Sequence, residues 1–236
     1  MLDVRNIAFA YGRKSVLRDV SFSVSPGEVV GVVGLNGAGK TTLLKILATL
    51  SMPDSGSVLF DSSDVFSRSL RYRRQVGYLA ETPPLYDDMT VKEFLEYRSK
   101  LKGESPKRVR RRVSEAMEVC KILSYARYSI KGLSAGLRRR VALADALMLR
   151  PRILLLDDFL SGLDLTFRER SSSILSEAAA FSATIVTGHE IADLAGCVTR
   201  FLVLKDGVVA SSIPVKGLSV QETCALVKKA MEGGLK

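Results

Sequence analysis

The chain has 236 residues, of which 47% are hydrophobic and 25% are charged, as in an average globular domain. This composition excludes a disordered chain, a collagen and a low-complexity linker, and the length suffices for a substantial core. The 35 Lys and Arg residues outnumber the 25 Asp and Glu residues, which leaves a formal net charge of +10 at pH 7. Such a charge favours anionic partners: a nucleotide, a nucleic acid or an acidic membrane surface.

The cysteines and the hydropathy pattern indicate the cellular compartment and the solubility of the protein. The three cysteines, Cys120, Cys197 and Cys224, lie far apart and have no metal-ligand spacing. We interpret them as small core hydrophobes in a reducing intracellular compartment. We expect no signal peptide, and no apolar run approaches the ~20 residues of a membrane span. A soluble protein is predicted, whose role at a membrane would require a partner.

The first part of the chain predicts strands separated by turns. Alternating apolar and polar residues indicate β-structure over residues 1–25, and the β-branched run at 28–33 predicts a buried parallel strand. A glycine-rich loop then leads into an expected helix over 40–50. A Pro-Asp-Ser-Gly turn at 53–56 precedes a further strand at 58–60.

From about Arg68 to Arg150 the pattern is mostly helical. Residues 91–101 predict one helix, and Ser105 followed by Pro106 predicts the start of the next. The apolar stripe of this second helix consists of Val109, Val113, Ala116, Cys120 and Leu123. Its opposite face carries Lys107, Arg108, Arg110, Arg111 and Arg112. We interpret the basic face as solvated, with a contact surface for anionic lipid or nucleic acid as the alternative.

After Pro151 strands alternate with helices again. Strands are predicted at 153–156 and 183–186, with a helix at 167–181 between them. Two further strands at 201–204 and 208–210 flank a Lys-Asp-Gly turn and predict a hairpin. The whole pattern predicts an α/β core interrupted by a helical insertion of roughly 80 residues, a size that suits a subdomain.

The strongest motif is a glycine-rich loop between a predicted strand and a predicted helix. Residues 34–41 fit GxxxxGK[ST] at every fixed position, in the strand–loop–helix context that this motif requires. Glycines allow backbone N–H groups to turn toward phosphates, and the helix N-terminus adds a positive dipole end. We expect Lys40 to reach the β- and γ-phosphates of a nucleotide and Thr41 to offer its hydroxyl to Mg²⁺. The candidate nucleotide-binding residues of this motif are Gly34, Leu35, Asn36, Gly37, Ala38, Gly39, Lys40 and Thr41.

A second motif is the apolar run at 153–156 that ends in Asp157 and Asp158. A carboxylate at the tip of a buried strand can face a metal, and Mg²⁺ prefers oxygen ligands. Many buried strands end in Asp, so this motif alone is weak evidence for a metal site. Together with the phosphate-binding loop it is strong evidence.

A third segment, 133–137, reads Leu-Ser-Ala-Gly-Leu and precedes three arginines. The order of the phosphate-binding loop, this segment, the strand ending in Asp157, the Ser-Gly-Leu-Asp run at 161–164 and the lone His189 resembles the ATP-binding subunit of ABC transporters. The resemblance covers nearly the whole chain. Residues 77–79 and 83–91 add a less specific likeness to subunits that pair with drug-export or gliding-motility-type permeases.

The resemblance implies a P-loop NTPase fold of the α/β class, with a mainly parallel sheet, an antiparallel β subdomain and a helical insertion subdomain. The expected single domain, 1–236, comprises a core with the β subdomain (1–80 and 151–215), a helical subdomain (81–150) and a C-terminal helix (216–236).

The resemblance also implies roles for particular residues, and it adds Thr42 to the nucleotide-binding set. Tyr11 stands where an aromatic ring stacks on adenine, although a strand-end tyrosine can simply pack on its neighbours. Ser134 and Gly136 match the signature that closes over ATP bound by another subunit, in a homodimer or a heterodimer. His189 matches a switch residue that contacts the γ-phosphate. Glu81 stands at the position that senses Mg²⁺ and a transmembrane permease.

Several positions depart from the family pattern. The general base, usually Glu, is here Asp158, whose carboxylate would lie ~1.5 Å back from the attacking water. A displacement of ~1 Å can cost ~10²-fold in rate. The following Pro-Thr is Phe159-Leu160, the first signature Gly is Ala135, the signature Gln is Leu137, and Glu81 stands for Gln. We therefore predict that the chain binds ATP and Mg²⁺, and that its hydrolysis is slow or depends on a partner.

Three functions agree with these patterns. The first is an energy-coupling transporter subunit, cytoplasmic and peripheral on the inner face of the cell membrane. The second is a nucleotide-gated subunit that scarcely hydrolyses ATP. The third is a soluble ATPase acting on nucleic acid, which we disfavour because the chain has one copy of the motifs and no sustained heptads. The first interpretation is preferred, and no nucleic-acid partner is expected.

Overall fold

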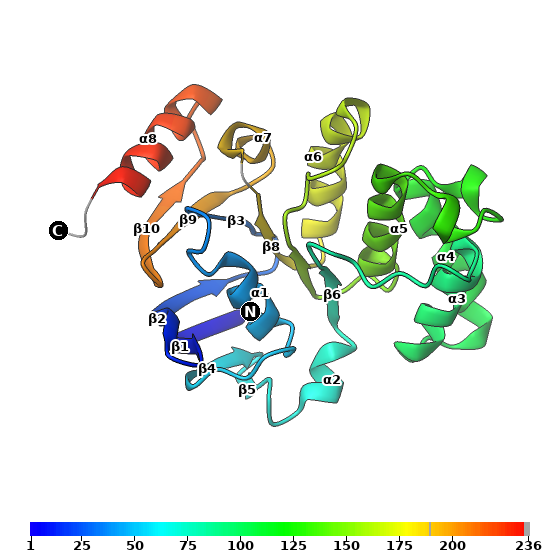
Figure 1. Cartoon of the computed structure of the whole chain (residues 1–236), viewed down its shortest axis with the longest axis horizontal. Helices are drawn as coiled ribbons and strands as arrows, with labels where there is room; N and C mark the ends of the chain where they lie inside the picture. Colours follow the sequence, from blue (N-terminus) through cyan, green and yellow to red (C-terminus); the bar gives the residue numbers. More distant parts are fainter. Residues whose placement is uncertain (189, 234–236) are drawn as a thin grey trace.

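The computed structural model describes residues 1–188 and 190–233, and its strands form one central sheet (Figure 1). The strands of this described part are β1 (Leu2–Tyr11), β2 (Lys14–Val24), β3 (Val29–Val33), β4 (Ser55–Phe60), β5 (Ser63–Asp64), β6 (Val76–Leu79), β7 (Ile153–Leu156), β8 (Ala183–Thr187), β9 (Arg200–Lys205) and β10 (Val208–Pro214). They pair in the order β5-β4-β1-β2-β10-β9-β3-β8-β7-β6. The run from β9 to β6 is parallel, and the run from β5 to β2 is antiparallel.

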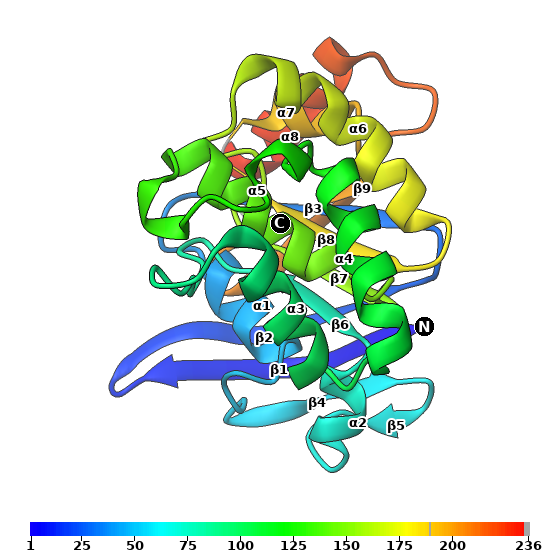
Figure 2. The same ribbon diagram turned by 90° about the vertical axis from the view of Figure 1, so that its right-hand side faces the viewer.

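The helices of the described part are α1 (Lys40–Leu47), α2 (Ser69–Arg73), α3 (Val91–Leu101), α4 (Pro106–Val119), α5 (Ala135–Leu147), α6 (Leu165–Ala179), α7 (Ile191–Ala195) and α8 (Val220–Glu232), with 3-10 turns at Leu123–Tyr125 and Ile130–Gly132. Helices α3, α4 and α5 form a group beside the β6 edge of the sheet (Figures 1 and 2). A capping box between Thr90 and Glu93 starts α3, and the Ser134 side chain caps α5.

Strands β3 and β7 are buried along their whole length, which explains their uninterrupted apolar sequences. Along β3, Val30 and Val32 join one hydrophobic cluster, whereas Val29 and Val33 join the other. This alternation is the two-residue period of a strand. One cluster contains α1 and the antiparallel strands, and the other contains α3 to α8. The two clusters hold the sheet in a fixed position between its helices, so the loops at its carboxyl edge have a rigid base.

The α/β fold with its parallel core and antiparallel strands is confirmed, and the expected hairpin is formed by β9 and β10. One part of the region expected to be mostly helical is instead strand β6, which pairs with β7 at the edge of the parallel sheet. The four residues of β6 are too few for a period to be recognised in the sequence. Helices α3–α5 and α8 lie within the expected helical ranges, and the division of the chain into subdomains stays a prediction.

Several helix ends differ from expectation. Helix α4 ends at Val119, so Leu123 of the expected apolar stripe lies in a 3-10 turn and is 46% exposed. Helix α1 ends at Leu47 because Thr49 has a left-handed backbone with φ of 57°. Helix α6 begins earlier than expected because the Asp164 side chain caps it by accepting from the Phe167 amide at 2.9 Å. Ser105 precedes α4 as expected but makes no backbone cap, since its hydroxyl accepts from Arg108 Nε at 3.2 Å.

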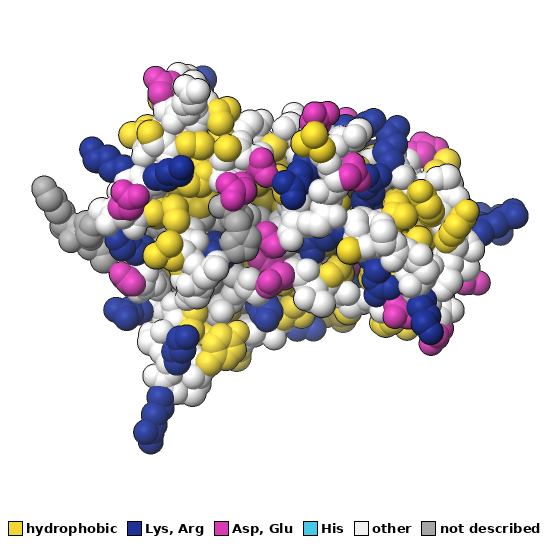
Figure 3. Space-filling view, turned by 45° about the horizontal axis from the view of Figure 1, so that its top comes forward, with side chains coloured by type: hydrophobic (Ala, Val, Ile, Leu, Met, Phe, Trp, Pro, Cys, Tyr) yellow, Lys and Arg dark blue, Asp and Glu magenta, His cyan; other side chains and the backbone are white. Residues whose placement is uncertain are grey.

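Figure 3 shows Lys and Arg side chains on every side of the displayed face, with acidic side chains among them.

Cys120 is buried, whereas Cys197 and Cys224 are only half-buried against the core, which corrects the expectation that all are core residues. Within the described ranges, no helix combines the length and apolarity that crossing a bilayer requires.

Candidate functional site

The phosphate-binding loop joins the end of β3 to the start of α1, as the motif predicts. Gly34 passes so close to β9 that an added Cβ would lie 2.2 Å from the Leu204 carbonyl oxygen. Gly39 has a φ of 102°, which disfavours any residue with a side chain. These two glycines let the backbone turn sharply into α1, whose first N–H groups lack acceptors within the helix. The loop therefore presents an anion-binding helix N-terminus.

The Lys40 side chain lies over the loop that precedes it. Its ammonium donates to the Gly34 carbonyl at 2.8 Å and to the Leu35 carbonyl at 3.2 Å. Burial lowers the pKa of Lys40, while Asp157 and Asp158 act in the opposite direction. The ammonium is thus placed between the loop and the carboxylates at the end of β7, where a polyphosphate would need a cation.

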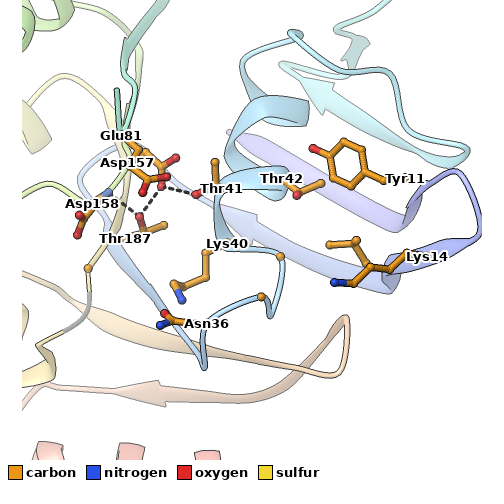
Figure 4. A pocket seen from close by; sticks show the side chains of 14 residues that line it. Tyr11, Lys14, Asn36, Lys40, Thr41, Thr42, Glu81, Asp157, Asp158 and Thr187 are labelled. Atoms are coloured by element: carbon orange, nitrogen blue, oxygen red, sulfur yellow. Dashed lines mark hydrogen bonds between the residues drawn. The ribbon is translucent and has the colours of Figure 1, made fainter. Parts of the chain in front are cut away.

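Asp157 is held at the tip of β7 by two hydroxyl groups. Thr41 Oγ1 donates to Asp157 Oδ1 at 3.2 Å, and Thr187 Oγ1 donates to the same oxygen at 2.8 Å. Thr187 also accepts from the Asp158 amide at 2.8 Å, so it joins both acidic residues to the end of β8. Figure 4 shows these three bonds, of which the one from Thr41 joins the start of α1 to the end of β7.

A cavity of about 340 Å³ lies beside these groups. Its lining includes the predicted residues Tyr11, Asn36, Gly37, Gly39, Lys40, Thr41, Thr42, Glu81, Asp157 and Asp158. Tyr11 lies across the loop from the carboxylates, is 53% exposed and packs edge-on against Phe9 with ring centroids 4.9 Å apart (Figure 4). A flat ligand could stack on its exposed surface, while the contact with Phe9 matches the packing alternative.

The oxygen groups fit a hard divalent cation. Asp157 is 1% exposed, and its Oδ2 has no hydrogen-bond partner among the described residues. A buried carboxylate oxygen without a donor is costly unless a ligand completes it. With the hydroxyl of Thr41 alongside, this oxygen supplies the donor type that Mg²⁺ prefers, and Mg²⁺ commonly takes its remaining ligands from water and phosphate.

Some predicted residues lie outside this cavity. Gly34, Leu35 and Ala38 line a neighbouring cavity of about 260 Å³ on the other side of the loop. Ser134 and Gly136 belong to the first turn of α5 and are absent from the cavity lining. His189 lies outside the described residues.

The segment around Gly136 instead packs against the loop that precedes α6. An added Cβ on Gly136 would lie 3.0 Å from the Gly162 carbonyl oxygen. Arg140, on the next turn of α5, pairs with Asp164 and stacks over the Phe167 ring at 4.3 Å from its centroid. The signature segment is therefore fixed to the chain that follows β7, with Ser134 exposed at its end.

The cavity also contains residues that sequence reasoning missed. Lys14, Val16, Thr187 and Gly188 line it in addition to the predicted set. Lys14 and Val16 come from β2, which no motif marks. Thr187 directly follows the strand predicted at 183–186, but its contact with Asp157 is formed only when β8 pairs with β7.

Arg139 is a further residue that the sequence did not single out from the three neighbouring arginines. It is 6% exposed, and its guanidinium donates to the carbonyl oxygens of Ala80, Glu81, Asp157 and Asp158. Burial lowers the pKa of Arg139, whereas the nearby carboxylates of Asp158, Asp157 and Glu81 favour its charged form.

Comparison with known proteins agrees with this arrangement. The family model described as ABC transporter matches residues 17–161, which include the phosphate-binding loop, the signature segment and the end of β7. The chain belongs to the ABC transporter family. ABC ATPases bind ATP.

The ABC relatives include transporter subunits and dimeric cassettes. The chain is 30% identical over 239 residues to YxlF, an uncharacterized ABC transporter ATP-binding protein of Bacillus subtilis (strain 168), with 100% of this chain and 79% of YxlF covered. It is 36% identical over 210 residues to Nod factor export ATP-binding protein I of Burkholderia orbicola (strain AU 1054), covering 87% and 68% of the two chains. The dimeric structure of MJ0796, a bacterial ABC transporter cassette, has a TM-score of 0.84 at 26% identity, covering 92% of this chain and 100% of that one.

Proposed function

We propose that this chain is the ATP-binding subunit that drives a separate membrane permease through ATP binding and hydrolysis, with hydrolysis slowed by Asp158. The observation that carries the proposal is the joint placement of Lys40, Thr41 and Asp157 around one cavity. A polyphosphate needs a cation and free N–H groups, and its metal needs oxygen ligands. These requirements meet in one place.

The nucleotide would lie along the phosphate-binding loop with its base toward Tyr11. Lys40 would bind the β- and γ-phosphates, and Thr41 and Asp157 would hold Mg²⁺, with Glu81 near the same metal. When bound, Mg²⁺ neutralises phosphate charge and orients the terminal phosphate. His189 matches the family's switch residue in sequence, and we therefore propose that it contacts the γ-phosphate.

Asp158 is the proposed general base that orients the attacking water. Its backbone has a φ of 49°, and its amide is bound to Thr187. The side chain is one methylene shorter than the usual Glu, so the carboxylate would lie farther from a water at the γ-phosphate. The alternative function, a nucleotide-gated subunit that scarcely hydrolyses ATP, follows from the same substitution.

A second subunit would complete the site. Ser134 and Gly136 lie outside the cavity of their own chain, as expected for a signature that contacts ATP in a partner. MJ0796, which is dimeric, supports such an assembly. In a homodimer both sites combine Asp158 with the altered signature, whereas a heterodimer with an unaltered partner has one alteration in each site.

The permease would contact a groove of about 530 Å³ between α1, β6 and α3. Its apolar lining includes Leu50, Pro83, Pro84, Leu85 and Phe94. Its charged lining consists of Lys45, Arg73, Arg98, Lys102 and Asp145, so cations exceed anions. This charge favours a cytoplasmic permease segment that is apolar and carries a carboxylate. Binding there would place the protein at the inner face of the membrane.

Phosphate release by the purified protein with ATP and Mg²⁺ tests the proposal, beside the variants Lys40→Ala and Asp158→Glu. We expect slow turnover in the wild type, faster turnover in Asp158→Glu and none in Lys40→Ala. Turnover that persists in Lys40→Ala would reject the proposed site. A silent wild type with an active Asp158→Glu variant would favour the nucleotide-gated alternative or an obligatory partner.

Nucleic-acid binding distinguishes the remaining alternative. The displayed face in Figure 3 has no continuous basic stripe of the kind that tracks a phosphate backbone. We expect no salt-sensitive binding to DNA or RNA. Strong binding that decreases steeply with salt would favour the soluble ATPase function instead.

A further inference from the structure

Helix α5 connects three places that the proposed function uses. Its first turn carries the signature residue Gly136, Arg139 follows one turn later, and Ala142 and Asp145 line the permease-facing groove. An α-helix rises only about 1.5 Å per residue and is stiff, so these places move together. A displacement of α5 at the groove is therefore also a displacement at Arg139.

The Arg139 guanidinium joins α5 to both strand ends that border the nucleotide cavity. Its Nη1 donates to the Ala80 carbonyl at 2.7 Å and to the Glu81 carbonyl at 2.8 Å, directly after β6. Its Nη2 donates to the Asp157 carbonyl and, at 2.8 Å, to the Asp158 carbonyl, directly after β7. A planar guanidinium has its N–H groups in a fixed fork, so these bonds require one relative orientation of the three elements.

The turn after β7 needs such support because of its backbone. Asp158 has a φ of 49°, in the left-handed region that is sparsely populated by residues with side chains. On the other side of the turn, Thr187 accepts from the Asp158 amide through Oγ1 at 2.8 Å and from the Phe159 amide through its carbonyl at 3.0 Å. Arg139 and Thr187 thus hold opposite sides of the peptide groups that direct the Asp158 side chain.

We propose that Arg139 is a positioning residue for hydrolysis, which couples the placement of helix α5 to the direction of the Asp158 carboxylate. The inference rests on the proposed function and adds a route between the groove and the hydrolytic turn. A permease segment that displaces α5 changes the position of Arg139, and the carbonyl groups bound to Arg139 follow. The route runs through backbone carbonyls rather than through the nucleotide.

Amide hydrogen exchange tests the link without requiring turnover. The amides of Asp157 and Ser161 are bonded to the carbonyls of Leu79 and Asp158 at 2.8 and 3.1 Å, so their exchange reports on the turn. In Arg139→Met, which removes the donors but keeps the length of the side chain, we expect faster exchange at 157–161 and 80–82. Unchanged exchange at 157–161 would overturn the proposal.

Arg200 provides a matched control away from the cavity. Its guanidinium bridges Glu28 Oε1 at 3.3 Å, Ser212 Oγ at 3.2 Å and the Ser23 carbonyl. Arg200→Met should destabilise the sheet near these residues and leave exchange at 157–161 unchanged. Faster exchange at 157–161 in both variants would show a general loss of stability and reject a specific role for Arg139.

Kinetics test the positioning role in the wild type or, if that is silent, in the Asp158→Glu background. We expect Arg139→Met to lower kcat by about 10²-fold, as for a misplaced catalytic group, with the KM for ATP unchanged. Arg139→Lys keeps the cation but has a single nitrogen, so it should restore only part of kcat. The same lysine variant, assayed for exchange and kcat, replaces Arg139→Met if the latter does not fold.

The outcomes separate the two proposals. A higher KM with unchanged kcat in Arg139→Met would overturn the positioning role. Absence of hydrolysis in both backgrounds would reject the proposed ATPase function, while the exchange experiment would still decide whether Arg139 holds the turn.

Discussion

Asp157 and Asp145 are both buried carboxylates, with 1% and 6% exposure, but the regions around them treat them differently. Asp157, at the end of β7, accepts from the hydroxyls of Thr41 and Thr187 through one oxygen only. Its other oxygen has no hydrogen-bond partner in the described part of the chain. Asp145, in α5, pairs with Arg98 at 3.0 Å and with Lys102 at 2.8 Å.

The different partners of the two carboxylates distinguish the proposed binding region around Asp157 from the supporting region around Asp145. Burial alone would raise the pKa of Asp145, but Lys102 and Arg98 hold that pKa below its ordinary value. The charge of Asp145 is thus compensated within the protein. Asp157 keeps a buried oxygen without a donor, which costs stability and is compensated when a cation binds. Similar burial therefore accompanies different partners, which agrees with the proposed binding role of Asp157 and a supporting role of Asp145.

Of the variants that test this comparison, Asp157→Asn should have the largest effect on activity. We expect phosphate release to fall about 10³-fold, because an amide retains the contacts of Oδ1 but cannot provide charge to a metal. The free energy of unfolding should stay the same or rise, since a buried charge is removed. Phosphate release and urea denaturation followed by circular dichroism measure the two effects. A large loss of stability would show that Asp157 supports the fold as Asp145 does.

Asp145→Asn should have the largest effect on stability. The substitution leaves Arg98 and Lys102 without their carboxylate, and breaking a buried pair in this way costs about 3 kcal/mol. Urea denaturation should show this decrease, while the affinity for a fluorescent ATP analogue stays unchanged because Asp145 is outside the nucleotide cavity. An unchanged free energy of unfolding would contradict the supporting role of this cluster.

The acid dependence of stability should sharpen the comparison. Because the pKa of Asp145 is lower in the folded than in the unfolded protein, its stabilisation is present above about pH 3.9, the ordinary Asp pKa. It is lost as pH falls through the folded pKa. The difference in unfolding free energy between the wild type and Asp145→Asn should therefore narrow at acid pH. A constant difference from neutral to acid pH would indicate that the carboxylate charge contributes nothing.

The smallest effect is expected at an exposed pair on the same group of helices. Lys92 Nζ and Glu96 Oε1 are 3.9 Å apart, and the Lys92 side chain is 53% exposed. Lys92→Met should change the free energy of unfolding by about 0.3 kcal/mol, since water and salt screen such pairs. Lys92→Met, measured by the same urea denaturation, serves as the control for Asp145→Asn. A decrease in the free energy of unfolding as large as that of Asp145→Asn would mean that burial does not determine how much an ion pair stabilises this protein.

Local patterns predicted much of the fold and most of the residues that line the cavity beside Lys40. The glycines, Lys40 and Thr41 are neighbours in the sequence, so one motif identified the loop and its strand and helix. The strand ending in Asp157 was recognised by its apolar run. Strand β6 was placed in a region expected to be helical, because its four residues have no period of their own and gain their structure by pairing with β7.

The sequence by itself determined the family, the phosphate-binding loop and the order of the motifs, because these depend on residue types at short spacing. Only the tertiary structure decided which distant groups meet. Thr41 and Asp157 are 116 positions apart, and Arg139 and Ala80 are 59 apart. Such contacts arise when parallel strands bring their carboxyl ends to one edge of the sheet and α5 packs beside them. No local pattern separates Arg139 from Arg138 and Arg140, because burial against that edge is a property of the folded chain.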